Sequence, residues 1–130
     1  MYQKISKLED VLVWQEARIL MQMIYEATKS FPESEKYNLT RHMRECSRNM
    51  PGNVAEGFGR FHFQESMQFY RIARGSLLEL KSDIYCSFDC KYLEKKTFEN
   101  LLAQNEKVGR LLNGFINSAK KAKCSHTDNQ

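Results

Sequence analysis

The sequence predicts an all-α fold, an antiparallel up-down-up-down four-helix bundle whose second helix is kinked at Pro51. Three observations support this prediction. Only two prolines interrupt the chain. Apolar residues recur at steps of three and four along four long segments, which is the period of an amphipathic helix. The links between these segments have about three to six residues, a length that favours antiparallel neighbours in a bundle.

The first helix is expected over residues 9–30. Residues 6–9 read Ser-Lys-Leu-Glu and fit a capping box, in which the first and last side chains satisfy free N–H groups at the helix start. Pro32 follows the last periodic residue and ends the helix.

The second helix is expected over residues 34–58, and Pro51 lies inside it. Proline offers no N–H to the carbonyl of Ser47, and its ring clashes with that carbonyl, so we expect a kink at this point. Gly57 and Gly59 are expected to end the helix, because glycine is the usual residue just beyond a helix C-terminus.

The third and fourth helices are expected over residues 63–89 and 95–121. The chain of 130 residues has the length of one domain. We therefore assign residues 1–121 to the bundle domain and residues 122–130 to a polar C-terminal tail with frayed structure.

The composition of the chain limits which kinds of protein it can be. The formal net charge of +4 is compatible with an anionic partner without requiring one. No apolar run approaches the roughly 20 residues that a membrane span needs, so we expect no membrane association. No signal peptide precedes the cysteines, which indicates reduced thiols in the cytoplasm. These are Cys46, Cys86, Cys90 and Cys124.

Several stretches, in order along the chain, resemble a known family. They are residues 12–15 (LVWQ), 31–32 (FP) with 37–40 (YNLT), 51–60 (PGNVAEGFGR), 73–77 (ARGSL) and 109–114 (GRLLNG). In these stretches the chain resembles the four-helix-bundle family encoded in intervening sequences of bacterial large-subunit ribosomal RNA genes, the 23S rRNA-intervening sequence proteins. Residues 51–60 are the most specific match. The chain departs at Gly52, where a small side chain such as alanine is expected, and at Lys81, where a second acid is expected.

This family is in turn similar to the accessory proteins of diversity-generating retroelements. Those accessory proteins form pentamers, carry a basic surface, and bind nucleic acid and a reverse transcriptase. The resemblance therefore implies a nucleic-acid-associated, non-catalytic homo-pentamer, with RNA, DNA or a reverse transcriptase as its partners. The ribosomal-insert relatives themselves have no established activity.

Arginines on the second and third helices form a candidate phosphate-binding surface. Arg41, Arg44 and Arg48 follow at steps of three and four and point away from the apolar stripe of their helix. If the next helix is antiparallel, Arg74 lies level with Arg48, and one side of the hairpin carries a basic band. The candidate nucleic-acid-binding residues are Arg41, Arg44, Arg48, Arg60, Arg71 and Arg74.

Residues 51–60 also predict a structural motif at the end of this hairpin. A carboxylate near the core needs hydrogen-bond donors, so we expect Glu56 to join a network with Arg60 and Ser66. A catalytic acid would need a second carboxylate or a histidine beside it, and none is evident, so no catalytic residue is predicted. The motif consists of Pro51, Asn53, Glu56, Gly57 and Gly59.

Two pairs of metal-ligand residues have helical i, i+4 spacing, His42 with Cys46 and Cys86 with Cys90. The second pair lies nearly opposite the apolar stripe of the third helix. The two pairs are therefore not expected to converge, and we predict no metal site and no cofactor.

Phe69 and Ile72 form a candidate oligomer contact. They lie three positions apart on the third helix, away from its apolar stripe, and are therefore neighbours. Arg71 and Arg74 would edge this contact with charge, as at the polar rim of an interface.

These observations predict a non-enzymatic, oligomeric helical bundle that binds RNA, DNA or a nucleic-acid-processing protein through a basic face. The alternative is a protein–protein assembly module with no nucleic-acid binding. It stays open because acids interrupt the basic surface, at Glu45, Glu65 and Glu79.

Overall fold

The computed structural model describes residues 6–128, with the backbone alone described for residues 125–128. The described part is helical and contains no strand. Three short 3-10 turns, Leu8–Asp10, Thr28–Ser30 and Glu33–Glu35, accompany four long helices. The long helices are α1 (Leu12–Ala27), α2 (Leu39–Gly59), α3 (Phe63–Asp89) and α4 (Lys95–Asp128).

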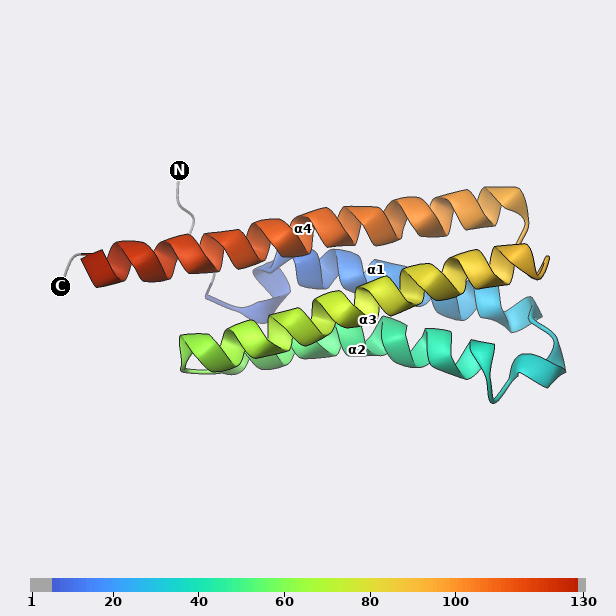
Figure 1. The fold of residues 1–130 in the computed structure, drawn as a ribbon, viewed down its shortest axis with the longest axis horizontal. Coiled ribbons are helices and arrows are strands. Elements are labelled where there is room, and N and C mark those ends of the chain that lie inside the picture. Colours follow the sequence, from blue (N-terminus) through green and yellow to red (C-terminus); the bar gives the residue numbers. More distant parts are fainter. Residues whose placement is uncertain (1–5, 129–130) are drawn as a thin grey trace.

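The helices form the four-helix bundle that the sequence predicts (Figure 1). Consecutive helices lie side by side and run in alternating directions, so the α1–α2 and α3–α4 connections share one end of the bundle. Helices that follow one another in the chain pack together, and α1 also packs against α4, which closes the bundle. The α1–α2 side and the α3–α4 side are therefore opposite sides of the molecule.

The core is formed by the apolar stripes of all four helices. Each stripe follows the helical period, so one face of every helix turns inward. The largest side chains that are less than 2% exposed include Leu20, Ile24, Met43, Met50, Met67, Leu80, Ile84, Leu101 and Leu112.

The start of the first helix differs from the prediction. Helix α1 begins at Leu12, after the turn Leu8–Asp10, and no side-chain hydrogen bond caps either element. Val11 separates them with an extended backbone, and its side chain is fully buried. Burial of Val11 thus fixes the chain in a non-helical conformation here, and the predicted capping box is wrong.

Helix α2 begins at Leu39 instead of Ser34, because the turn Glu33–Glu35 comes first. It continues through Pro51, which is buried. Whether the helix axis bends at this proline stays a prediction. Gly57 lies inside the helix, and Gly59 is its last residue, so only Gly59 stands where a terminating glycine was expected.

Helix α4 extends to Asp128, so the predicted end at Lys121 is wrong. No glycine or proline lies between these two residues to stop the helix. Figure 1 shows α4 reaching beyond the end of the bundle at which α2 connects to α3.

Candidate functional site

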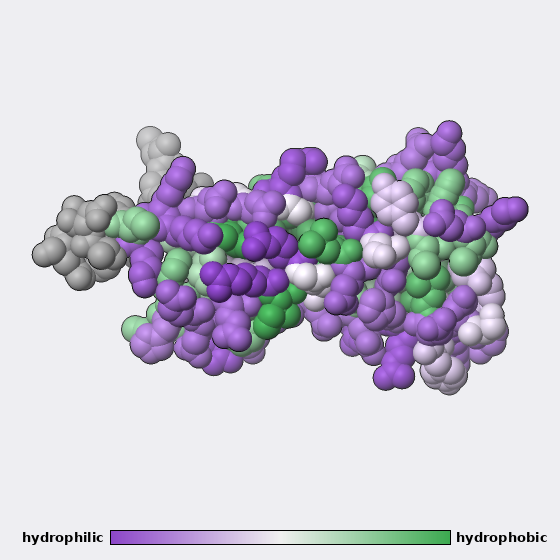
Figure 2. Space-filling view, in the orientation of Figure 1, coloured by the Kyte–Doolittle hydropathy of each residue, from purple (hydrophilic) through white to green (hydrophobic). Residues whose placement is uncertain are grey.

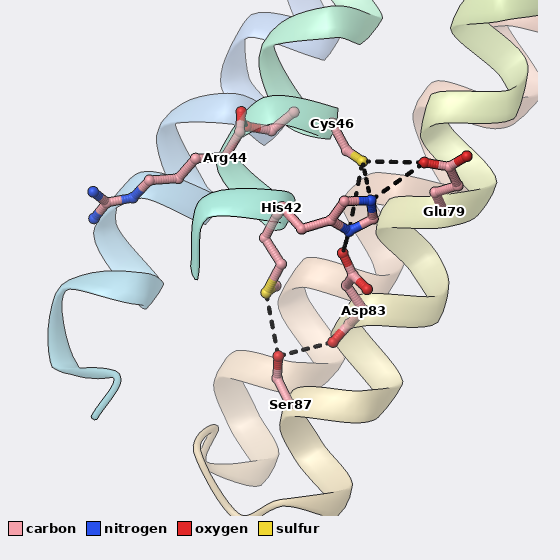
Figure 3. Close-up of polar contacts among 8 residues, drawn as sticks. His42, Arg44, Cys46, Glu79, Asp83 and Ser87 are labelled. Carbon is pink, nitrogen blue, oxygen red and sulfur yellow. Dashed lines mark hydrogen bonds and ion pairs between the residues drawn. The ribbon is translucent and has the colours of Figure 1, made fainter. Parts of the chain in front are cut away.

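Helix α2 turns polar side chains toward both of its neighbours. Figure 3 shows Arg44 pointing away from His42 and Cys46, on the other side of the helix. Arg44 contacts α1, whereas His42 and Cys46 face α3. One helix therefore contributes to two separate candidate sites.

The first site is a shallow hollow of about 450 Å³ between the end of α1 and the start of α2. We call it the α1–α2 hollow. It brings together the three arginines of α2 that the sequence singles out, and it adds a lysine and two tyrosines. Its lining residues are Tyr25, Lys36, Tyr37, Thr40, Arg41, Arg44, Glu45 and Arg48.

Arg44 is the anchored member of the α1–α2 hollow. Its Nε donates a 2.9 Å hydrogen bond to the hydroxyl of Thr28, and its second guanidinium nitrogen lies 3.4 Å from the carbonyl oxygen of Tyr25. The guanidinium also stacks 4.9 Å from the centre of the Tyr25 ring. These contacts join α2 to α1, so Arg44 holds the fold as well as lining the hollow.

The other basic groups of the hollow are more exposed. Arg41 Nε pairs with Glu45 at 3.0 Å, and Lys36 Nζ lies 3.8 Å from Glu33. Arg48 contacts only the carbonyl of Arg44, at 3.4 Å, among the interactions that the described residues show. Exposed ion pairs contribute little free energy, so a phosphate can displace these carboxylates at small cost.

The remaining three arginines lie elsewhere. Arg60 bridges Glu56 at 3.0 Å and Glu65 at 3.9 Å, at the end of the α2–α3 hairpin. Arg74 donates a 3.3 Å hydrogen bond to Asn113 of α4, and Arg71 is exposed on α3. Because Arg44 faces α1 and Arg74 faces α4, the expected single basic band is divided between two opposite sides of the bundle.

The motif of residues 51–60 packs the end of the hairpin. Asn53 donates a 2.7 Å hydrogen bond to the carbonyl of Asn49 within its own helix. Glu56 pairs with Arg60, as expected, but the described contacts do not include the expected link to Ser66. Gly57 lies under the ring of Tyr70, where no side chain would fit.

The second site is a compact polar cluster between α2 and α3, formed by His42, Cys46, Glu79 and Asp83 (Figure 3). We call it the His42 cluster. Nε2 of His42 lies 3.4 Å from Oε2 of Glu79, and Sγ of Cys46 lies 3.6 Å from each of these two atoms. The Nδ1 of His42 donates a hydrogen bond to the carboxylate of Asp83.

The environment of the His42 cluster shifts the acidity of its groups. The hydrogen bond from His42 to Asp83 raises the pKa of the imidazole above 6.5, although burial opposes this shift. Burial, followed by the hydrogen bond to Glu79, raises the pKa of the Cys46 thiol to about 12. The thiol is therefore un-ionised at neutral pH unless a cation approaches it.

Sequence reasoning did not find this cluster, because it compared only histidine and cysteine pairs. Cys86 and Cys90 are exposed, and the partners of His42 and Cys46 on α3 are carboxylates. The signal that could have found it is the i, i+4 spacing of Glu79 and Asp83, which matches the spacing of His42 and Cys46 on the facing helix.

The candidate oligomer contact lies partly on the surface. Ile72 is 46% exposed, whereas Phe69 is half-buried with the guanidinium of Arg60 5.0 Å from its ring centre. Other apolar side chains are exposed as well, including Leu78 on the same helix. Figure 2 shows hydrophobic patches breaking the mostly hydrophilic surface of one face of the bundle.

Within residues 6–128, no helix has the length and apolar character needed to cross a membrane.

The chain matches the model of a known protein family, although no curated protein matches it. The family model of the 23S rRNA-intervening sequence protein matches residues 9–114 and confirms the resemblance carried by the sequence motifs. Since that match covers most of the chain, the protein belongs to the 23S rRNA-intervening sequence protein family.

Proposed function

We propose that this protein is a non-enzymatic module that binds RNA or DNA through the α1–α2 hollow. The observation that carries the proposal is the gathering of Arg41, Arg44, Arg48 and Lys36 around one hollow. Guanidinium groups bind phosphate through paired, charge-assisted hydrogen bonds, and Arg44 is held in place by Tyr25 of α1 and by Thr28 before any ligand arrives.

The tyrosines of the hollow suit a nucleic acid better than a free anion. Tyr37 is 77% exposed beside these cations, and Tyr25 lies under the guanidinium of Arg44. An exposed aromatic ring beside basic groups can stack on an unpaired base, which adds affinity with little sequence preference. We therefore expect a preference for single-stranded over duplex nucleic acid.

A salt titration of binding to mixed single-stranded RNA and DNA oligonucleotides tests the proposal. Binding through phosphates must weaken with salt, with a log–log slope of about −0.7 per contact for single strands. An absence of binding at low salt would reject the proposal. It would leave the alternative, in which the basic face meets an acidic protein surface.

Self-association is the second candidate property, and the exposure of Ile72 favours it. An apolar side chain edged by Arg71 on α3 resembles the centre and rim of a small interface. The homo-pentamer and the reverse transcriptase partner are proposals that come from the family resemblance alone. Light scattering coupled to size exclusion measures the assembly: a mass near 15.3 kDa at tens of micromolar would reject it.

A further inference from the structure

We propose that His42, Cys46 and Glu79 form a binding site for a zinc-class divalent cation. Asp83 does not bind the ion in this proposal but accepts a hydrogen bond from His42 and so orients its ring. The site lies between α2 and α3, away from the α1–α2 hollow, and does not depend on nucleic-acid binding. The three candidate ligand atoms are Nε2 of His42, Sγ of Cys46 and Oε2 of Glu79.

The spacing of these atoms fits a tetrahedral ion. Zinc binds thiolate sulfur at about 2.3 Å and imidazole nitrogen or carboxylate oxygen at about 2.0–2.2 Å, which places neighbouring ligand atoms about 3.3–3.6 Å apart. The observed separations are 3.4 Å between nitrogen and oxygen and 3.6 Å from sulfur to each. One ion can therefore contact all three atoms with little movement of the side chains.

Asp83 orients the histidine for this role. Its carboxylate accepts the hydrogen bond from Nδ1, which leaves Nε2 facing Cys46 and Glu79 (Figure 3). A carboxylate behind a metal-bound histidine is a common outer-shell arrangement in zinc sites, where it fixes the ring and raises its basicity. Asp83 is itself well shielded, with 16% of its side chain exposed.

The scaffold keeps one side of the site closed and one side open. Cys46 is 3% exposed, whereas the side chains of His42 and Glu79 are 46% and 64% exposed. An ion can therefore enter from solvent, and water can fill its fourth position. Three protein ligands with one open position is the arrangement of zinc sites that exchange ligands.

The donor set selects the class of ion. A thiolate and an imidazole favour zinc and similar borderline ions over Mg²⁺ and Ca²⁺, which prefer oxygen ligands. Three carboxylates act on the thiol, those of Glu79, Asp83 and Glu45. Since Glu45 is paired with Arg41, Glu79 and Asp83 supply the negative charge that attracts a cation. When the ion binds, the thiol proton and the proton that a charged His42 carries on Nε2 pass to solvent, so the sulfur coordinates as thiolate and the nitrogen as neutral imidazole.

Cobalt is the probe for the test, because Co²⁺ replaces zinc in such sites and shows a thiolate-to-cobalt charge-transfer band. The protein is the full chain with Cys86→Ser, Cys90→Ser and Cys124→Ser, so that Cys46 is its one thiol. We expect about one Co²⁺ per chain with this band, visible bands of tetrahedral cobalt, and their loss when Zn²⁺ is added.

Ligand and control variants are made in the same background. His42→Gln and Glu79→Gln, whose side chains are partly exposed, should weaken Co²⁺ binding by at least about tenfold, and Asp83→Asn by about ten- to a hundredfold. His62→Gln is the matched control, because His62 is exposed outside the cluster. Circular dichroism checks that each variant is folded.

The proposal is overturned if the one-thiol protein shows no charge-transfer band with Co²⁺. It is also overturned if folded His42→Gln and Glu79→Gln variants bind Co²⁺ as tightly as the His62→Gln control.

Discussion

The ring of Tyr70 on α3 packs directly over the backbone of Gly57 on α2. A Cβ built on Gly57 would lie 2.5 Å from Cε1 of Tyr70 and 3.0 Å from the carbonyl oxygen of Ser66. Both distances are shorter than ordinary contacts allow, and Tyr70 is 4% exposed and also packs against the ring of Phe115. The two helices can approach this closely only because position 57 has no side chain.

Replacing Gly57 with alanine should therefore destabilise the bundle. We expect the free energy of unfolding to fall by about 1–3 kcal/mol, because the ring and the two backbones must separate. Gly52→Ala is the control, since nothing lies within 4 Å of its added Cβ. It should stabilise the helix by about 0.5–1 kcal/mol. Urea unfolding measures both, and equal stability of the two variants would show that the contact with Tyr70 does not limit packing.

Arg44→Gln should lower stability by about 1 kcal/mol, because it removes the hydrogen bond to Thr28 and the contact with the Tyr25 carbonyl. Arg48→Gln should change stability little, since Arg48 is exposed and contacts only a backbone carbonyl among the described interactions. Thermal unfolding compares the two variants. A larger loss at Arg48 would contradict the anchoring role of Arg44.

Nucleic-acid binding should depend on the hollow and not on charge in general. The triple variant Lys36→Gln, Arg41→Gln, Arg48→Gln leaves Arg44 in place and should reduce the salt slope of binding by about 0.7 per lost phosphate contact. A second triple variant removes the same charge from α3 and α4, at Arg71, Arg74 and Arg110. Arg74 bonds Asn113 of α4, Arg110 lines a hollow between α3 and α4, and Arg71 is exposed on α3. Fluorescence anisotropy with a labelled oligonucleotide compares them. Equal losses would favour diffuse binding over the hollow.

If α3 carries the subunit contact, Ile72→Glu should give a folded protein of lower mass in size exclusion with light scattering. A buried charge disrupts an apolar interface, whereas the 46% exposure of Ile72 within one chain makes the change tolerable for the fold. Leu78→Glu, at a second exposed apolar position of the same helix, shows whether the contact extends along α3, because Leu78 is 62% exposed. An unchanged mass for Ile72→Glu would place any contact elsewhere.

The pairing of Glu16 with α4 predicts a pH-dependent part of the stability. Hydrogen bonds from Lys107, at 2.8 Å, and from Gln104 lower the pKa of Glu16 in the folded state. Its contribution is thus complete above the unfolded pKa and is lost as the pH falls through the lower folded value. Glu16→Gln should be less stable than the natural chain at about pH 7, and the difference should shrink at about pH 3. A difference that does not change with pH would contradict this pairing.

The sequence by itself determined which segments are helical and, for the second and third helices, which residues enter the core. Helical periodicity is a local property, so the stripes containing Met43, Met50, Leu77 and Ile84 follow from the order of the residues alone. The helix ends were less predictable, because the start of α1 depends on burial of Val11 by other parts of the chain.

Only the tertiary structure decided which neighbouring helix the polar side chains of each helix contact. Periodicity gives the direction of a side chain around its own helix axis, but the neighbour that covers it depends on how the helices pack. That packing sends Arg44 toward α1 and Arg74 toward α4, and it sets Glu79 opposite His42. The divided arginines and the His42 cluster are therefore products of helix pairing, which no single helix encodes.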